Sequence, residues 1–523
     1  MTTPHLIHDI AAEFTDYLRD ESRRVGQADG ITFPTSEADI RAALPEAHQR
    51  HWSLTLQGAR TGITAGAVPN GGLILNLSRM QKILGLRRAP NGDFILQVEP
   101  GLTLTELRRQ IADRSFDTIF WSKDSLLALD AFRAAGPFFF PPDPTEASAS
   151  IGGMVACNAS GACSYHYGPT RRFIEGLDVI LADGDTVRLR RGEHRAVGRA
   201  FSVQTESGRT LHGQIPDYSL PAVKNASGFH AEDNMDLVDL FIGAEGTLGI
   251  IASVELRLIP APAAVWGITA FFPSLDPAVE FVARLRLTPL AVAPIAIEFF
   301  DEHALNLLRG QKSTNPTFAA IPDMPAAFNT AIYVEFHGPT DDVISEAVMV
   351  LSDLMVACGG SEEATWIATD SRELDRFKKF RHAVPEAVNL LIDQRRKTEP
   401  GLTKLGTDMS VPDSDLKDIL VLYTRTLAET GLEYVIFGHI GNNHVHVNII
   451  PKDMAEYDKG KALYLTWARE VIRRGGSVSA EHGIGKLKIA LLREMYGDAG
   501  IAAMRAVKAS FDPEGLLNRG NLF

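Results

Sequence analysis

The 523-residue sequence contains only three cysteines, Cys157, Cys163 and Cys358. Three thiols cannot form a disulfide framework, and they cannot supply the four sulfurs of an iron–sulfur cluster. Cys157 and Cys163 could together bind a metal, but small buried thiols are the favoured interpretation.

Long hydrophobic runs are also missing. The longest, 264–272 and 290–300, are far too short to cross a membrane, so we expect no transmembrane segment.

An excess of positive charge is absent as well. The chain has 52 Lys and Arg residues against 65 Asp and Glu residues, a formal net charge of −13. This balance disfavours non-specific binding to nucleic acid or to anionic lipid. Residues 1–20 are interrupted by charged and histidine side chains and contain no signal-peptide core. We therefore expect a cytoplasmic protein, and leave open a peripheral attachment to the inner membrane through a partner.

The pattern of strands and helices changes near residue 260. Before it, β-type runs such as 94–98 and 248–258 are separated by glycines and short helical pieces. Two closely spaced prolines within 258–263 predict the end of a strand and a stiff connector. After it, longer amphipathic helices such as 340–357 alternate with strands such as 331–336. The pattern predicts an α+β protein.

Glycines are concentrated in three segments of the first half, 57–66, 141–161 and 241–250. In the first segment, glycines four residues apart let successive backbone amides converge on an anion. A tight surface turn explains that segment equally well when it is taken alone. The sequence has neither a G-x-G-x-x-G opening a βαβ unit nor a Walker A motif, which argues against a Rossmann fold. Together the three segments predict a long, phosphate-bearing cofactor.

Three histidines lie within eight residues of one another: His439, His444 and His446. On a strand, His444, His446 and Asn448 share one face, and the Gly-Asn-Asn turn can fold His439 back towards His446. Two imidazoles held across a turn form half of a divalent-metal site. A single histidine is more often a satisfied core residue, but three so close together favour a metal.

Glu481 is a candidate carboxylate ligand for the same metal, which would complete a site of two histidines and one carboxylate with open positions. The adjacent His482 is a candidate general base. Taken alone, this pair is better explained as a helix-entry turn with a capping glutamate. Arg381 and Lys404 are candidate receptors for a substrate carboxylate, and surface salt bridging is the alternative for both.

Short motifs along the chain carry a resemblance to a known family. They are Phe33-Pro-Thr-Ser36, Gly66-Ala-Val-Pro69, Pro141-Pro-Asp-Pro144, Ile151-Gly-Gly153, Asn158-Ala-Ser-Gly161, Tyr167-Gly168, Glu245-Gly-Thr-Leu-Gly249, Gly438-His439, Ala480-Glu-His-Gly483, Asp512-Pro513 and Leu517-Asn518. In this order and spacing, the sequence resembles the flavoproteins of the vanillyl-alcohol-oxidase and p-cresol-methylhydroxylase (PCMH) superfamily. It is most similar to the D-2-hydroxyacid branch, which holds D-lactate dehydrogenase, the glycolate oxidase flavin subunit and D-2-hydroxyglutarate dehydrogenase.

The resemblance implies an α+β fold with a split PCMH-type FAD-binding domain and a ferredoxin-like α+β substrate cap domain. A C-terminal helical segment would return to the FAD-binding domain. The expected divisions are an N-terminal helix in 1–26, the FAD-binding domain in 27–260, the cap domain in 261–470 and the C-terminal FAD-linked oxidase segment in 471–523.

The resemblance also implies roles for individual residues. The expected FAD-binding residues are Gly58, Ala59, Arg60, Thr61, Gly62, Gly66, Pro142, Asp143, Ile151, Gly152, Gly153, Ala156, Asn158, Ser160, Gly161, Glu245, Gly249, Ile250, Ile251 and Asn518. His439, His446 and Glu481 correspond to the metal ligands of the branch. Arg381, Lys404 and Asn448 correspond to substrate contacts, and His482 corresponds to the base.

Three departures from the family pattern stand out. Ala59 and Arg60 replace two glycines of the usual Gly-Gly-Gly-Thr-Gly loop. His444 takes the place of a residue that is usually Asn, so a third imidazole ligand is left open. Residues 114–136 form a helix-like insertion of no assigned purpose. The 57–66 loop contains no histidine, so we expect FAD to be bound there without a covalent link.

These expectations combine into a function: FAD-dependent, metal-assisted oxidation of a D-2-hydroxy acid to the 2-oxo acid, with hydride transfer to flavin N5. The favoured metal is zinc, and manganese and iron stay open. The expected partners are a small 2-hydroxy acid and an external electron acceptor: a quinone, an electron-transfer protein or an Fe–S partner. A homodimer is left open. The alternatives are a non-redox flavoenzyme of the alkyl-glycerone-phosphate synthase type and a flavin-free metalloprotein.

Overall fold

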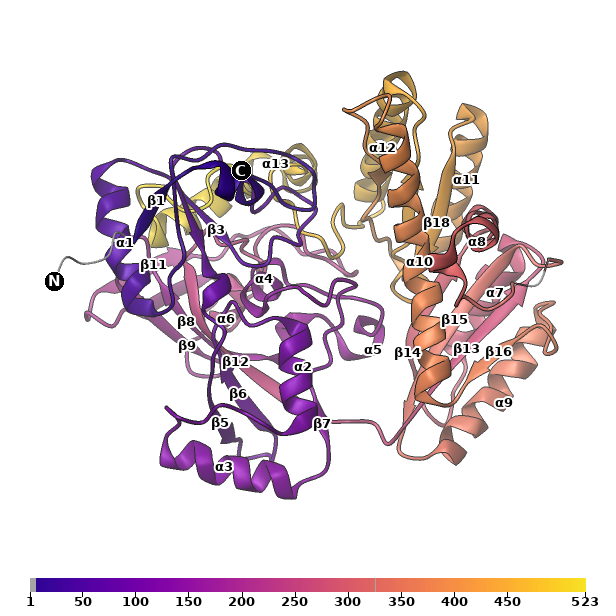
Figure 1. Cartoon of the computed structure of the whole chain (residues 1–523), viewed down its shortest axis with the longest axis horizontal. Coiled ribbons are helices and arrows are strands. Elements are labelled where there is room, and N and C mark those ends of the chain that lie inside the picture. The colour runs from indigo at the N-terminus through magenta and orange to yellow at the C-terminus, as the bar shows by residue number, and fades with distance from the viewer. Residues whose placement is uncertain (1–5, 325) are drawn as a thin grey trace.

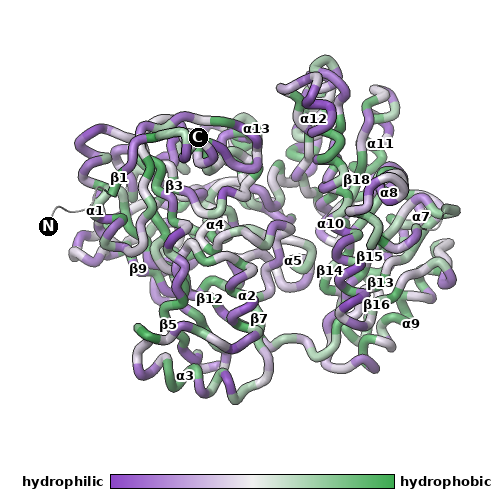
Figure 2. The backbone as a smooth tube through the Cα atoms, viewed as in Figure 1, coloured by the Kyte–Doolittle hydropathy of each residue, from purple (hydrophilic) through white to green (hydrophobic). Residues whose placement is uncertain are grey.

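The computed structural model describes residues 6–324 and 326–523. It has two lobes of mixed helix and sheet (Figure 1), the first made by the N-terminal half together with the C-terminal tail. Figure 2 shows hydrophobic stretches along strands such as β3 and β12 inside the first lobe. No helix among the described residues is both long and apolar enough to cross a membrane.

A four-stranded sheet with the order β1-β2-β4-β3 lies in the first lobe. Its strands are β1 (Ile7–Asp9), β2 (Gly30–Thr32), β3 (Leu54–Gln57) and β4 (Leu73–Asn76). Helix α1 (Glu37–Gln49) begins where the Ser36 side chain accepts a hydrogen bond from the Asp39 amide. Its apolar face shares a buried cluster with β3 and β4.

A second sheet of the first lobe has the order β5-β6-β12-β8-β9, and β7 pairs with the end of β12. Its strands are β5 (Ile83–Arg88), β6 (Phe94–Val98), β7 (Phe138–Phe139), β8 (Ile174–Ile180), β9 (Thr186–Arg190) and β12 (Ile250–Pro260). The remaining elements are the β10 (Ala200–Gln204) and β11 (Thr210–Gln214) hairpin and helices α2 (Leu104–Asp113), α3 (Lys123–Ala134), α4 (Ile151–Cys157), α5 (Ser164–Tyr167) and α6 (Val238–Phe241).

The second lobe is built on a seven-stranded antiparallel sheet with the order β16-β13-β15-β14-β18-β19-β17. Its strands are β13 (Ala264–Phe272), β14 (Pro294–Phe300), β15 (Thr330–Gly338), β16 (Trp366–Ala368), β17 (Leu405–Gly406), β18 (Tyr434–Gly438) and β19 (His446–Ile449). Its helices are α7 (Leu275–Leu287), α8 (Glu302–Thr314), α9 (Asp341–Ala357), α10 (Ser371–Arg395), α11 (Leu416–Thr430) and α12 (Met454–Arg473).

The tail of the chain returns to the first lobe. Helix α13 (Ile489–Phe511) lies over that lobe in Figure 1. The Leu54 amide then donates to Leu516 O at 2.8 Å, and the Asn518 amide donates to Leu54 O at 2.7 Å. The α+β fold with a returning C-terminal segment is therefore confirmed, whereas the division points at 26, 260 and 470 stay predictions.

The N-terminal segment differs from the expected helix. Residues 1–5 lie outside the described residues, Ile7–Asp9 form strand β1, and Ala12–Leu18 form a short 3-10 helix. None of the residues of the 3-10 helix is fully buried, so little packing stabilises a longer α-helix there. Ile7 instead pairs with Thr32 on β2 and is buried.

The predicted insertion at 114–136 contains α3, which covers β5. The indole nitrogen of Trp121 donates to Ile83 O at 2.8 Å, and Phe132 is buried edge-on against Phe94. The insertion is therefore anchored to the sheet. It also carries the strongly exposed Ile119 and Phe120.

All three cysteines are free thiols, and Cys163 is buried. None of them belongs to a metal-binding group among the described residues.

Candidate functional site

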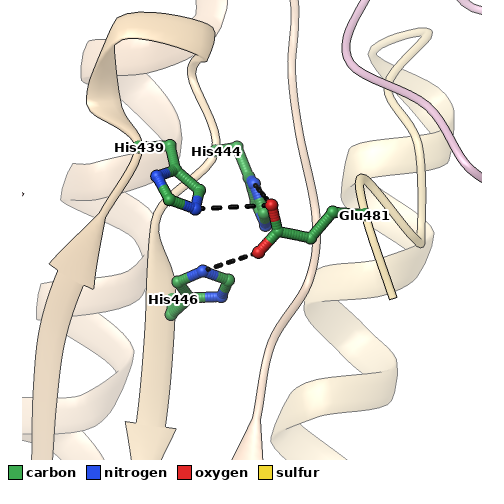
Figure 3. Close-up of side chains that lie close together, drawn as sticks. All are labelled: His439, His444, His446 and Glu481. Atoms are coloured by element: carbon green, nitrogen blue, oxygen red, sulfur yellow. Dashed lines mark ion pairs between the residues drawn. The ribbon is translucent and has the colours of Figure 1, made fainter. Parts of the chain in front are cut away.

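The β18–β19 hairpin brings the three histidines together. Strand β18 ends at Gly438, the 3-10 turn Ile440–Asn442 follows, and Asn443 adopts a left-handed φ of 52°. The His444 amide donates to His439 O at 3.1 Å, which closes the turn. Figure 3 shows all three rings beside one carboxylate, that of Glu481 from the segment between α12 and α13.

The distances make a compact donor set. His439 Nε2 lies 3.3 Å from Glu481 Oε2, and His446 Nε2 lies 3.4 Å from Glu481 Oε1. The His444 ring is beside them, with Nδ1 4.0 Å from Glu481 Oε2. One ligand atom from each of the four residues lies within 4.8 Å of the others. Imidazole and carboxylate donors so close together fit a divalent metal ion.

The outer nitrogens of two rings are already engaged. His439 Nδ1 pairs with Glu298 Oε1 at 2.8 Å, and His446 Nδ1 donates to Thr407 O at 3.1 Å. This arrangement fixes both Nε2 atoms toward Glu481, as partners behind metal-binding histidines do. Burial acts to lower the pKa of His439, but the charges of Glu298 and Glu481 and the hydrogen bond to Glu298 together outweigh it and raise that pKa to about 9.

A cation also faces the carboxylate. Lys224 Nζ lies 2.7 Å from Glu481 Oε2, and both side chains are over nine-tenths buried. Burial acts to raise the pKa of Glu481, but Lys224 and the histidines hold it well below its ordinary value. Glu481 is therefore an ionised carboxylate in a buried site, the form that ligates a metal.

Asp408 connects the donor set to His482. Its Oδ2 lies 3.3 Å from His482 Nδ1, and its carboxylate accepts the Glu481 amide at 3.2 Å and the His482 amide at 3.1 Å. The second nitrogen of His482, Nε2, lies 3.5 Å from Glu481 Oε1. An imidazole whose Nδ1 faces a carboxylate has Nε2 free to accept a proton. The structure thus brings His482 to the edge of the donor set.

Arg381 is held on the cap by acidic and aromatic neighbours. Its Nη1 lies 3.4 Å from Glu335 Oε2, and its guanidinium carbon lies 5.0 Å from the centre of the Tyr333 ring. Glu335 also accepts hydrogen bonds from the Tyr333 hydroxyl at 2.5 Å and His337 Nε2 at 3.0 Å. Arg381 is therefore a largely buried cation with a fixed orientation, not a surface salt bridge.

Lys404 differs from Arg381 in its lack of bonded partners among the described residues. Within the described part of the chain it makes neither an ion pair nor a hydrogen bond. Burial, followed by the charge of Arg23, lowers its pKa to about 8. The β17 strand that follows pairs Gly406 with the buried Asn448 on β19. Lys404 therefore lies just before a strand that pairs with β19, the strand that carries His446 and Asn448.

The 57–66 loop follows β3 and presents free backbone amides. Within the described residues, none of the seven amides from Arg60 to Gly66 donates a hydrogen bond to the protein. The carbonyls are held from behind: Thr64 O accepts the Lys486 amide at 2.9 Å, and Gly66 O accepts Asn521 Nδ2 at 3.0 Å. Such a run of unpaired amides fits a pyrophosphate.

Arg60 occupies a position where the family pattern has glycine, and it adopts a left-handed φ of 62°, a region that favours glycine. Its guanidinium carbon lies 4.4 Å from the centre of the Tyr17 ring, and Nη1 donates to Asp16 O. The side chain thus contacts the N-terminal segment. A pyrophosphate contact by its charge stays a prediction, as does the role of Thr61.

The expected flavin-binding segments contact one another. Gly58 packs so closely on Ser150 that a Cβ there would lie 2.1 Å from its Oγ, and Ser150 caps α4. At the other end of α4, the Glu245 amide donates to Ala156 O at 2.8 Å. Pro142 precedes Asp143, which abuts Gly161, and Gly249 leads into Ile250 and Ile251 at the start of β12. The segments form one continuous region.

Glu245 and Asn518 join this region to the C-terminal tail. The Glu245 carboxylate accepts the amides of Ile484 and Gly485 at 2.7 and 2.8 Å. Asn518 accepts the Leu56 amide at 2.7 Å and donates to Glu245 O at 2.6 Å. Both polar groups of the Asn518 side chain are thus bonded to protein, and its contact with the flavin stays a prediction.

Sequence reasoning gave no role to three residues of the site. Asp408 lies four residues after Lys404, and its sequence neighbours give no indication of a partner at His482. Glu298 could have been noticed as a lone acid within the apolar run 290–300, because a buried charge in a strand needs a partner. Lys224 gave no signal, since its partner Glu481 lies 257 residues away.

The comparisons with known proteins agree with this architecture. Residues 261–522 match the family model described as FAD linked oxidases, C-terminal domain, and residues 28–119 and 125–190 match the FAD binding domain model. The chain belongs to the family of FAD-linked oxidases, and it is an FAD-linked oxidoreductase of the PCMH type.

Named relatives span almost the whole chain. The "Probable D-lactate dehydrogenase, mitochondrial" of Danio rerio is 30% identical and covers 96% of this chain and 86% of its own length. D-2-hydroxyglutarate dehydrogenase of Stutzerimonas stutzeri (strain A1501) is 27% identical over the full length of both. A solved structure of alkyldihydroxyacetonephosphate synthase has a TM-score of 0.66 at 16% identity, covering 98% of this chain and 82% of its own, which shows a shared fold alone.

Proposed function

We propose that this chain oxidises a D-2-hydroxy acid to the 2-oxo acid, using non-covalently bound FAD and a divalent metal, zinc before manganese or iron. The observation that carries the proposal is the link between its two predicted binding regions. Ser160, in the flavin-binding segments, lies 3.4 Å from Glu481 Oε2 in the histidine cluster. A substrate bound beside this contact would meet a redox cofactor and a Lewis acid together.

When bound, FAD supplies the hydride acceptor, and the metal ion polarises the substrate oxygens. His439, His446 and Glu481 are the proposed ligands. The protein's own step is at His482, where Nε2 takes the proton of the substrate hydroxyl. Asp408 Oδ2, 3.3 Å from Nδ1, then stabilises the resulting imidazolium, as a carboxylate partner does for other catalytic histidines.

Recognition of the acid is assigned to Arg381, Lys404 and Asn448. Arg381 offers a planar guanidinium, which suits bidentate binding of a carboxylate, and Glu335 limits its movement. Of these three residues, Lys404 gives the strongest support for an anionic substrate, because a largely buried ammonium without a counterion among the described residues favours an anionic ligand. The electron acceptor, and assembly into a homodimer, stay predictions.

Anaerobic mixing of the FAD-loaded, metal-loaded protein with small compounds tests the reaction class. We expect D-2-hydroxy acids to bleach the flavin absorption, L enantiomers to do so more slowly, and the matching esters or neutral alcohols not to do so. Equal bleaching by the alcohols would contradict the carboxylate receptors. Reaction only with long-chain ether precursors would point to the non-redox chemistry of the synthase type. Failure of the protein to bind FAD would contradict the proposal that it acts as a flavoenzyme.

Lys404→Met gives a focused test of the carboxylate site. Losing one hydrogen bond from a charged donor costs about 1.5–3 kcal/mol, so KM should rise roughly 10- to 150-fold. Thermal stability should not fall, because no described carboxylate loses its ion-pair partner. Lys461→Met on the exposed side of α12 is the matched control. Steady-state kinetics with an unchanged KM in the Lys404 variant would remove Lys404 from the site.

A further inference from the structure

His444 is an unsatisfied imidazole at the centre of the histidine cluster. Its side chain is fully buried, and neither ring nitrogen has a hydrogen-bond partner among the described residues. Buried polar side-chain atoms in folded proteins are nearly always bonded, and a neutral imidazole has one donor and one acceptor to satisfy. The unsatisfied acceptor nitrogen therefore points to a ligand that is not a protein group.

The ring is placed so that each nitrogen faces a different neighbour. Nδ1 lies on the side of Glu481 Oε2, at 4.0 Å, whereas Nε2 lies 3.1 Å from Asp408 Oδ1 without being aligned for a hydrogen bond. The ring centre lies 4.5 Å from that of His446 and 5.3 Å from that of His439. Figure 3 shows the three rings around the same carboxylate.

We propose that His444 is a third imidazole ligand of the metal and binds it through Nδ1. This inference rests on the metal of the proposed function and deepens it, making the set three histidines and one glutamate. A small rotation of the ring would let Nε2–H donate to Asp408. The Asp408–His444 pair would then repeat the arrangement of Glu298 behind His439, where the far nitrogen is fixed by a carboxylate.

The backbone around His444 is rigidly positioned. Asn443, in its left-handed conformation, accepts a hydrogen bond from Arg286 Nη2 at 2.6 Å and donates to Val411 O at 3.1 Å. On the other side, Asp408 is fixed by Ser479 Oγ and Lys488 Nζ, both at 2.6 Å. A ligand and its partner that are both preorganised bind a metal without a further ordering cost.

The third imidazole changes which metals the site prefers. Imidazole suits zinc, copper, iron and nickel, whereas carboxylate and water suit Mn²⁺. We therefore expect His444 to favour Zn²⁺ over Mn²⁺ relative to a site with two histidines.

His444→Asn in the full-length flavoprotein tests the inference, and it restores the residue usual in the family pattern. Chelator competition measures Zn²⁺ and Mn²⁺ affinity separately, without reference to activity. Losing even a partner behind a metal ligand typically costs 10- to 100-fold in affinity, so we expect Zn²⁺ to bind at least roughly 10- to 100-fold more weakly. Mn²⁺ should lose less. His446→Asn is the positive control, and His303→Asn, on the exposed side of α8, is the matched neutral control.

X-ray absorption at the zinc edge of the wild-type protein provides a second measurement that needs no variant to fold. It should show three imidazoles bound to zinc, and two in His444→Asn. Two imidazoles in the wild type, or unchanged zinc affinity in the variant, would overturn the inference and leave His444 as a packing residue. Failure of the wild type to bind any divalent metal is a different outcome, because it would contradict the proposed function's requirement for a metal and not only the role of His444.

Discussion

His482→Asn should slow flavin reduction by about 10²–10⁴, the range typical of a positioned general base, while metal and FAD remain bound. The expectation follows from the geometry. His482 lies outside the group formed by His439, His444, His446 and Glu481, although it forms a second possible donor group with Asp408 and Glu481, and its side chain is 30% exposed. Asparagine is smaller and polar, so it leaves the Asp408 carboxylate accessible to water. Anaerobic stopped-flow absorbance measures the reduction step directly.

The pH dependence of flavin reduction in His482→Asn distinguishes a general base from a residue that only packs beside the site. A base acts only when it is neutral, so wild-type reduction should rise with pH, and this limb should vanish in His482→Asn. Metal-bound substrate can ionise over the same range, so the two proteins must be compared fully metal-loaded. His303→Asn should retain the wild-type profile. A loaded His482 variant with a near wild-type rate and the same limb would leave His482 as a packing residue.

The sequence could predict what depends on local patterns. The loop 57–66, the turn that gathers His439 and His446, and the Glu481-His482 pair are short motifs whose residue types already indicate their chemistry. The structure adds geometry that a motif cannot contain, such as the free amides of the loop. The match to the family of FAD-linked oxidases confirms the fold and the enzyme class that these motifs predicted.

The parts that escaped prediction depend on contacts between distant segments. Glu298 comes from β14 and orients His439 from 141 residues away, and Asp408 meets His482 across 74 residues. Lys224 comes from the first lobe and meets Glu481 across the two halves of the chain. No periodicity in a single sequence encodes such pairs. The N-terminal strand is a further example. Ile7 pairs with β2, a contact that the N-terminal residues alone do not indicate.

Glu481→Gln should remove the metal and lower turnover by about 10²–10⁴, while the flavin stays bound. Losing a Lewis acid removes several kcal/mol of transition-state stabilisation, which corresponds to that range. The substitution has a second consequence, because Lys224 Nζ lies 2.7 Å from Glu481 and both are buried. Removing one member of a buried ion pair typically costs about 3–5 kcal/mol. A single variant would therefore lose both metal and stability.

The double variant Lys224→Met with Glu481→Gln separates the two effects. Removing the ammonium leaves no buried charge without its partner, so the free energy of unfolding should recover most of its loss. Metal content and turnover should not recover, because a neutral amide cannot replace the ionised carboxylate of Glu481 among the three imidazoles. Urea unfolding and elemental analysis of the two variants and of Lys224→Met alone give the comparison. If Glu481→Gln retains a full complement of metal, or if restored stability restores turnover, Glu481 acts through the fold and not as a ligand.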